Sequence, residues 1–237
     1  MSIIYINPYR FAAAGPTDPD FANVSLLLHG DGANGSTTIV DSSPSPKTVT
    51  AFGDAQISTA QSKFGGASMY FDGSGDSIRS TQSASWSFGA DNFTIECWVN
   101  SSDTGQYASI ASADLQPVDG WALLLNSVSN DGKIAFFEKN LASSLLVTSS
   151  GAFNNSSWHH VAVVRNNTNL SIYVNGTSLA SSTVSGSATS AGTLYLGGSS
   201  VSPARDFIGY IDDLRITKGV ARYTANFTPP TAPFPDA

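Results

Sequence analysis

Short apolar runs separated by polar turns set the pattern of this chain from Val24 onward. The runs are rich in β-branched and aromatic residues, and Gly, Asn, Asp and Ser clusters separate them at nearly regular intervals, which is typical of strands in a sandwich. The predicted strands lie in VSLLL, TVTAF, SMYF, FTIECWV, YASIAS, WALLLN, KIAFFE, SLLVTS, WHHVAVVR, LSIYVNG, LYLGG and FIGYIDDLRI. We therefore predict an all-β fold of two antiparallel sheets, with about 12–14 strands and almost no helix.

The turns between these runs predict two hairpins. NNTN at 166–169 joins one pair of strands, and the Asp-Gly turn in NDGK at 130–133 joins another. Single helical turns are expected only in SASWSF at 83–88 and GVARYT at 219–224.

Three segments follow from the same pattern. Residues 1–23 contain three prolines and no sustained periodicity, so we expect an extended docking arm with the aromatics Tyr5, Tyr9, Phe11 and Phe21. Residues 24–218 form the predicted sandwich. Residues 219–237 are rich in proline, which cannot donate to a central ladder, so this tail should wrap the outside of the sandwich.

Composition narrows the class of protein. A chain of 237 residues fits one large all-β domain about as well as two small domains, so length alone does not settle the number of domains. The net charge of -7 and the lack of a Lys/Arg cluster argue against nucleic acid as a partner. No apolar run approaches the ~18 residues of a membrane span, and the first residues do not resemble a signal peptide. The single cysteine, Cys97, lies in an apolar run and has no disulfide partner in the chain.

Several motifs resemble a known family. KFGGASMYFDGSGDSI (63–78), FTIECWVN (93–100), WHHVAVVRNNTNLSIYVNG (158–176), TLYLGG (193–198) and FIGYIDDLRITKGVARYTANFTPPTAPF (207–234) follow the order of the LamG-type jelly rolls of the concanavalin A-like lectin/glucanase superfamily. The resemblance covers nearly the whole domain and implies a jelly-roll sandwich. That fold carries lectins, adhesion modules, enzymes and spacers, so its implication for function is broader.

The two ends of the chain add a second resemblance. NPYRFAAAG, the following SLLLHGDGANGSTTIVDSSPSPK, and the closing GVARYTANFTPPTAPFP are similar to LamG-domain proteins from the structural-gene regions of bacteriophages, notably marine ones. This resemblance implies a protein made in the host cytoplasm without a signal peptide and located on the virion surface. The expected partners are other virion proteins, through the arm, and further copies of the chain, with a trimer as one arrangement.

Catalytic chemistry is not favoured. Glycosidases need two carboxyl groups across the scissile bond, whereas the strand that matches the glucanase motif carries only Glu96, with Thr94 and Trp98 on the same face. The neighbours His159 and His160 point to opposite faces of a strand, which argues against a shared metal. We expect no enzyme activity and no catalytic residues.

Glycan binding requires an aromatic platform and polar side chains that grip hydroxyl groups. The candidates on these grounds are Glu96, Trp98, Asn100, Tyr107, Trp121 and Asn126. The polar loops at 101–106 and 114–120 bracket a tryptophan and are expected to form the rim. Against this, most large aromatics in a sandwich belong to the core.

The segment YIDDLRI, at 210–216, changes its apolar phase at Asp212 and Asp213. Either both faces of this strand are covered or a β-bulge lies at the acids. Because adjacent strand residues face opposite ways, a joint acid/base role is disfavoured. The resemblance implies that this last strand lies beside the first, where Asp31 and Asp41 would join Asp212 and Asp213 around a structural Ca²⁺. The alternative is that one of the two acids is solvated, while the other accepts backbone N–H groups or pairs with Arg215 or Arg79.

The leading functional hypothesis is therefore a non-enzymatic bacteriophage virion surface protein, either a capsid decoration or a tail fibre component, that binds cell-surface glycans weakly. Many copies would supply avidity. Two alternatives stay open: a carbohydrate-binding module or glycoside-active enzyme, and a bacterial surface adhesin.

Overall fold

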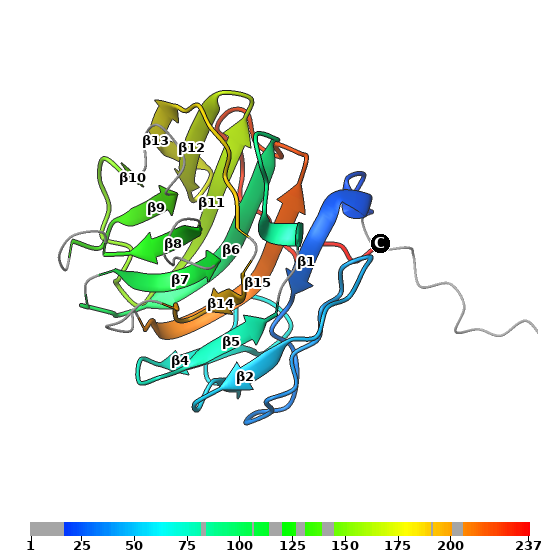
Figure 1. Ribbon diagram of the computed structural model, residues 1–237. Helices are drawn as coiled ribbons and strands as arrows, with labels where there is room; N and C mark the ends of the chain where they lie inside the picture. The colour runs from blue at the N-terminus through cyan, green and yellow to red at the C-terminus, as the bar shows by residue number, and fades with distance from the viewer. Residues whose placement is uncertain are drawn as a thin grey trace, which may run out of the picture.

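The structure is a computed structural model, and it is a sandwich of two antiparallel sheets (Figure 1). The described residues are 17–81, 84–105, 107–113, 120–126, 131–138, 145–190, 192–200 and 206–237. The arm aromatics Tyr5, Tyr9 and Phe11 lie outside them. No α-helix occurs in these ranges, so the all-β prediction is confirmed, and they contain no helix long and apolar enough to cross a membrane.

The first sheet has eight strands, in the order β13-β12-β11-β6-β15-β4-β3, with β1 also paired to β15. Their bounds are β1 Val24–Leu28, β3 Gln56–Ser58, β4 Ser68–Asp72, β6 Phe93–Ser101, β11 Trp158–Asn166, β12 Asn169–Val174, β13 Thr177–Thr183 and β15 Ile208–Lys218. The first strand thus lies beside the last, as the family resemblance implied.

The second sheet has seven strands, in the order β10-β9-β8-β7-β14-β5-β2. Their bounds are β2 Thr50–Phe52, β5 Ser77–Ser80, β7 Ala108–Ala113, β8 Trp121–Leu125, β9 Ile134–Glu138, β10 Leu145–Val147 and β14 Leu194–Leu196. Both predicted hairpins are present, as β11–β12 and β8–β9.

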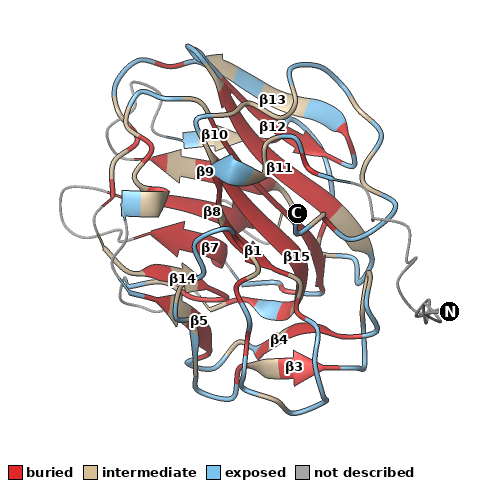
Figure 2. Ribbon diagram, turned by 90° about the vertical axis from the view of Figure 1, so that its right-hand side faces the viewer, coloured by how far each residue is buried: buried red, intermediate tan, exposed pale blue. Residues whose placement is uncertain are grey.

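The core lies between the two sheets and follows from period-two alternation along the strands. In β6, Phe93, Ile95, Cys97 and Val99 all belong to the main core cluster and are 0% exposed. Buried residues dominate the central strands of both sheets (Figure 2). Burial also raises the pKa of the Cys97 thiol, which makes this side chain an inert part of the core.

The first described residues meet the C-terminal residue beside β1. The backbone N–H of Asp18 donates to the carbonyl oxygen of Ala237 over 2.9 Å, and the C-terminus lies next to β1 in Figure 1. Phe21, the arm aromatic within the described range, packs with Val24, Leu27 and Phe234. The last residues of the arm and the end of the tail therefore lie on the sandwich itself.

Details of the elements differ from the sequence prediction in two respects. All predicted runs contain strands, but β3, β5 and β13 were not anticipated, because they are short or polar. A short 3₁₀ helix, Ala84–Trp86, confirms the first expected helical turn, whereas 219–224 contains no helical turn and runs along the sheet surface.

Candidate functional site

The outer face of the eight-stranded sheet, turned away from the seven-stranded sheet, is the surface where the polar candidates gather. Along β6, Thr94, Glu96, Trp98 and Asn100 alternate with the core residues and therefore point to this face. Their cross-strand neighbours on β11 and β15 share it, because directly paired residues lie on one side of a sheet.

A β-bulge in β15 changes which side chains reach this face. Asp212 pairs with Trp98 and Arg215 pairs with Glu96, so three steps along β15 oppose two along β6. The extra residue is Asp213, whose φ is 49°. Of the two alternatives that the sequence left open, the bulge at the acids is present. It corrects the inference that the two acids face opposite ways, because both carboxyls contact groups on the outer side.

Glu96 lies at the centre of a buried ionic network. Arg215 donates to Glu96 Oε1 from Nε and Nη2, over 3.0 and 2.7 Å, and the Tyr223 hydroxyl donates to Oε2 over 2.7 Å. His160 Nε2 lies 3.3 Å from the same Oε2. Burial alone would raise the pKa of Glu96, but the Arg215 charge and the contacts with His160 and Tyr223 lower it to about 2. Glu96 is therefore ionised and enclosed.

The network continues to the N-terminal end of the described chain through Asp18. Arg222 donates to both carboxylate oxygens of Asp18, over 3.0 and 2.8 Å, and Arg215 Nη1 donates to Oδ2 over 3.0 Å. These contacts lower the pKa of Asp18 in spite of its burial. Two arginines and two carboxylates thus connect residue 18, β6, β15 and the tail.

The tail covers this part of the face with aromatic rings. Tyr223 and Phe227 stack with ring centroids 3.6 Å apart, and both approach His160 and Tyr173. Gly176 permits this approach, because a Cβ at its φ of 77° would overlap the carbonyl oxygen of Phe227. We call this region, around Glu96, Arg215 and Tyr223, the covered half of the outer face.

The acids proposed for calcium have other partners. Asp213 Oδ1 lies 2.6 Å from His29 Nδ1, and its Oδ2 accepts the N–H of Phe234 over 2.7 Å. Asp41 accepts four hydrogen bonds, from the N–H groups of Leu27, Ser43 and Lys47 and from the Ser43 hydroxyl. Asp213 therefore joins the first strand, the last strand and the tail, and Asp41 fixes its own loop.

Asp212 differs in the partners of its two oxygens. Oδ2 accepts the N–H groups of Lys63 and Phe64 over 2.6 and 3.1 Å, whereas Oδ1 is buried and has no hydrogen-bond partner among the residues that the structure describes. Burial raises the pKa of Asp212 to about 7, although the two N–H groups lower it; the negative charges of Asp213 and Asp31 add a smaller upward shift.

These contacts do not fit a calcium cage. N–H groups, a histidine and one hydroxyl that acts as a donor face the carboxylates of Asp41, Asp212 and Asp213, and the side chain of Asp31 is exposed. Across the described ranges, no group of three or more His, Cys, Asp or Glu side chains is arranged to hold a metal ion. The calcium site stays a prediction that this geometry does not favour.

Two residues beyond Trp98, the same face opens into a groove. Five cross-strand neighbours form a row over β11, β6, β15, β4 and β3, namely Trp158, Asn100, Tyr210, Tyr70 and Gln56. A groove of about 310 Å³ lies along this row and is lined by Gln61, Tyr70, Asn100, Ser101, Ser102, Ser156, Ile208, Gly209 and Tyr210. We call it the tyrosine groove; its lining is aromatic and polar, and none of the lining residues is charged.

The groove combines a ring surface with available hydrogen-bonding groups. The rings of Tyr70 and Tyr210 lie 5.0 Å apart at 40°. The side-chain amide of Asn100 has no partner in the described part of the chain, and Ile208 is 42% exposed at the edge. Gly209 keeps the floor flat, since a Cβ at its φ of 138° would overlap the carbonyl oxygen of Asn100.

The six glycan-binding candidates from the sequence do not form one site. Asn100 lies in the tyrosine groove, Trp98 is buried beside it under Lys63, and Glu96 is in the covered half. Trp121 is fully buried and donates to the carbonyl oxygen of Trp86. The other two, Tyr107 and Asn126, lie at the ends of strands of the second sheet.

Only part of the predicted rim, the loops at 101–106 and 114–120, lies within the described residues. The loop after β6 borders the tyrosine groove through Ser101 and Ser102. Gln106 and residues 114–119, which complete the predicted rim, lie outside the described residues. Sequence reasoning missed Tyr70 and Tyr210; the available signal was a tyrosine at the non-core phase of each strand, between Met69 and Phe71 and before Ile211.

Comparisons with solved structures give the same architecture. Domain 4 of AbnA, a GH43 extracellular arabinanase from Geobacillus stearothermophilus, in complex with arabinotriose, superposes with a TM-score of 0.64 at 19% identity, covering 84% of this chain and 94% of that chain. The binding domain of Paraclostridial Mosquitocidal Protein 1 gives 0.64 at 17% identity, and that of botulinum neurotoxin serotype D gives 0.62 at 15%.

This chain spans 50% of each of those two toxin binding domains, while 84% and 86% of its own length is covered. At these identities the likeness shows the fold alone. No curated protein matches the sequence. The family comparison is more specific, since residues 72–222, more than half of the chain, match the Laminin_G_3 family. The protein therefore belongs to the concanavalin A-like lectin/glucanases superfamily.

Proposed function

We propose that this protein is a carbohydrate-binding protein that holds an uncharged oligosaccharide in the tyrosine groove. The observation that carries the proposal is the row in which Asn100 stands between Trp158 and Tyr210, with Tyr70 beyond. Aromatic rings pack against the apolar faces of sugars, and a fixed amide both donates to and accepts from hydroxyl groups.

The chemistry of the lining supports a neutral ligand. The groove presents amides from Asn100 and Gln61, hydroxyls from Ser102 and Ser156, and the two tyrosines, without a carboxylate or a cation. A charged glycan would lose its hydration here without gaining an opposite charge. The arabinotriose held by the structurally similar arabinanase domain is a ligand of the class that we propose.

Binding without hydrolysis is the version of this function that the acids support. Glycoside hydrolysis requires two carboxyl groups beside the scissile bond. Glu96 is enclosed by Arg215 and Tyr223, and no lining residue of the groove is acidic. The superfamily also includes glucanases, so release of reducing sugar from a bound oligosaccharide is the result that would count against this assignment.

Substitution of the two groove tyrosines tests the proposal. Tyr70→Ala and Tyr210→Ala should each weaken binding of neutral oligosaccharides by roughly three- to tenfold, because a stacked ring contributes about 0.5–1.5 kcal/mol in comparable contacts. The oligosaccharides are first identified on an immobilised glycan library. Leu145→Ala is the control, because it also truncates an exposed side chain, 42% exposed, but lies on the second sheet outside the groove. Unchanged affinity in both tyrosine variants would refute the groove as the site.

We also propose a biological setting, namely the virion surface of a bacteriophage, with Tyr5, Tyr9 and Phe11 as docking residues of the arm and several copies per particle. The support is the sequence resemblance at the two ends of the chain. Weak single sites gain avidity in such arrays. Mass spectrometry of purified particles should detect the chain; its absence from particles, or its recovery from bacterial surfaces, would contradict this setting and leave the groove assignment standing.

A further inference from the structure

One arginine, Arg79, has guanidinium groups without hydrogen-bond partners among the described residues. Arg165, Arg215 and Arg222 each donate from Nε, Nη1 and Nη2 to protein oxygens. Arg79 donates only from Nε, to the Ser77 hydroxyl over 2.8 Å, and no ion pair involves it in the described ranges. Its two Nη groups are therefore available to a ligand.

The guanidinium of Arg79 is held in place by aromatic rings. Its central carbon lies 4.0 Å from the ring centroid of Phe52 and 4.9 Å from that of Tyr195. Thr50 and Tyr195 flank Arg79 directly on the neighbouring strands β2 and β14. Stacking and the Ser77 contact fix the side chain before any ligand arrives, so little rotamer entropy remains to be lost on binding.

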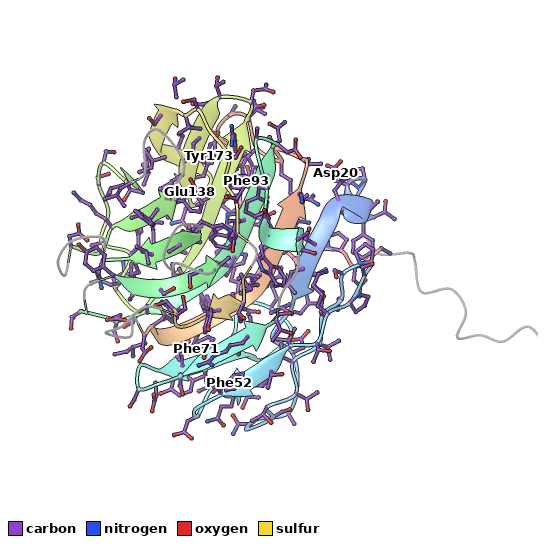
Figure 3. The ribbon with its side chains drawn as sticks, in the orientation of Figure 1. Asp20, Phe52, Phe71, Phe93, Glu138 and Tyr173 are labelled. Atoms are coloured by element: carbon purple, nitrogen blue, oxygen red, sulfur yellow. The ribbon has the colours of Figure 1, made fainter. Side chains whose placement is uncertain are left out.

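A pocket lies in front of this arginine. It has a volume of about 180 Å³ and is lined by Thr48, Thr50, Phe52, Arg79, Thr81, Thr193 and Tyr195. The alternation of β5 and β14 with core residues Ile78, Leu194 and Leu196 places it on the face of the second sheet turned away from the core. Figure 3 labels Phe52 at the lower edge of the molecule, away from Tyr173 under the tail.

The pocket combines one cation, which can bind a small anion, with hydroxyl groups and an aromatic ring, which can contact a sugar. Arg79 is the only ionisable cation in the lining, no lining residue is acidic, and four threonines supply hydroxyls. A guanidinium with both Nη groups available binds an oxyanion in a bidentate manner. Phe52, 41% exposed, adds an apolar surface of the size of a sugar ring.

We propose that this pocket binds one acidic sugar residue, through the oxyanion of a uronic acid or of a sulfated sugar. The net charge of -7 repels polyanions, so a single acidic residue in an otherwise neutral glycan is the ligand that one arginine can compensate. The site is independent of the tyrosine groove and lies on the other sheet, so the two proposals stand or fall separately.

The test is a titration of the full chain, followed by NMR or calorimetry, with three disaccharides. The first ends in glucuronate, the second is a neutral disaccharide that carries a 6-O-sulfate, and the third is the same neutral disaccharide without the sulfate. At least one acidic probe should bind tenfold or more tightly than the neutral one. Arg79→Gln should abolish that difference, and Arg79→Lys should keep only part of it, because a point charge lacks the bidentate fork. Raising salt should weaken the interaction.

Controls separate this role from a structural one. Lys133→Gln removes one positive charge elsewhere and should leave the titration unchanged, while thermal unfolding verifies that each variant is folded. If Arg79→Gln does not fold, Thr193→Val and Thr81→Val in the same pocket should still weaken the acidic probe severalfold. Equal affinity for acidic and neutral probes, or equal binding of free acetate and inorganic sulfate, would overturn the proposal.

Discussion

Two side chains on the same face of one strand have opposite environments, since one is enclosed and the other lines a groove. Glu96 and Asn100 both point outward from β6, four residues apart. Glu96 is charged, fully buried and bonded to Arg215 and Tyr223, whereas Asn100 is neutral and keeps its side-chain amide available in the tyrosine groove. The difference arises from the tail, which crosses the first position and does not line the second.

With the proposed function, the comparison describes a sheet face that is divided between stability and recognition. Buried ion pairs often return little net energy beyond their desolvation cost, but breaking one partner leaves an uncompensated charge. The covered half therefore acts mainly to fix where the tail and residue 18 lie. The tyrosine groove has no such network and is free to exchange water for a ligand.

The largest effect is expected from Glu96→Gln. The substitution removes one of the two carboxylates that pair with the buried Arg215 guanidinium and leaves Asp18 as its charged partner, so the free energy of unfolding should fall by about 3–5 kcal/mol. Urea unfolding followed by tryptophan fluorescence measures it. Asp236→Asn, which removes an exposed carboxylate from the same tail, should change stability by less than about 0.5 kcal/mol. A loss of similar size in both variants would contradict the division of the face.

Because of Asp212, which lies between the two halves, the free energy of unfolding should decrease as pH rises. Asp212 has a folded pKa of about 7 against an ordinary 3.8, so the folded state retains a proton that the unfolded state has lost between these values. Stability should therefore fall by up to about 4 kcal/mol as pH rises from 4 to 7. Asp212→Asn should remove most of this slope in urea unfolding at several pH values.

His29 adds to the same trend with a smaller contribution. The hydrogen bond to Asp213 raises the pKa of His29 above 6.5, so its stabilising effect is complete below that pH and declines as pH rises through the folded value. A residual slope near neutral pH in the Asp212→Asn protein, removed by the further change His29→Gln, is the expected result. A flat profile in the unmodified protein would rule out the raised Asp212 pKa.

Tyr223→Phe should have an intermediate effect. It removes one hydrogen bond to an ionised carboxylate, a contact that contributes about 1.5–3 kcal/mol in proteins, while it keeps the ring stack on Phe227. Tyr210→Phe in the tyrosine groove is the matched control, and its stability should change by less than about 0.5 kcal/mol. Equal losses would mean that both hydroxyls are structural.

The smallest stability effect is expected from Asn100→Ala, because the side-chain amide has no hydrogen-bond partner in the described ranges. Stability should stay within about 0.5 kcal/mol of the unmodified protein. Affinity for a neutral oligosaccharide should nevertheless fall about tenfold, since a hydrogen-bonding site that loses its polar group loses ligand affinity. A large loss of stability with unchanged affinity would reverse the roles that we assign to Asn100 and Glu96.

Several features of the fold follow from the sequence alone. Alternation in FTIECWV and its equivalents determines the strands and the inward residues, because period-two patterning requires only local geometry and a buried face. The phase change in YIDDLRI likewise gives a bulge at the two acids as one of two alternatives, and the structure places it at Asp213. Short polar strands such as β13 carry no such signal, since their pairing depends on β12 beside them.

The site required the tertiary structure. The sequence placed Glu96, Trp98 and Asn100 on one face, but it could not show that Arg215 and Tyr223, more than a hundred residues later, would enclose the first and leave the third open. Nor could it show that Tyr70 and Tyr210 meet. Local periodicity determines which way a side chain points, whereas strand order and the path of the tail decide what it meets there, and those depend on contacts between distant segments.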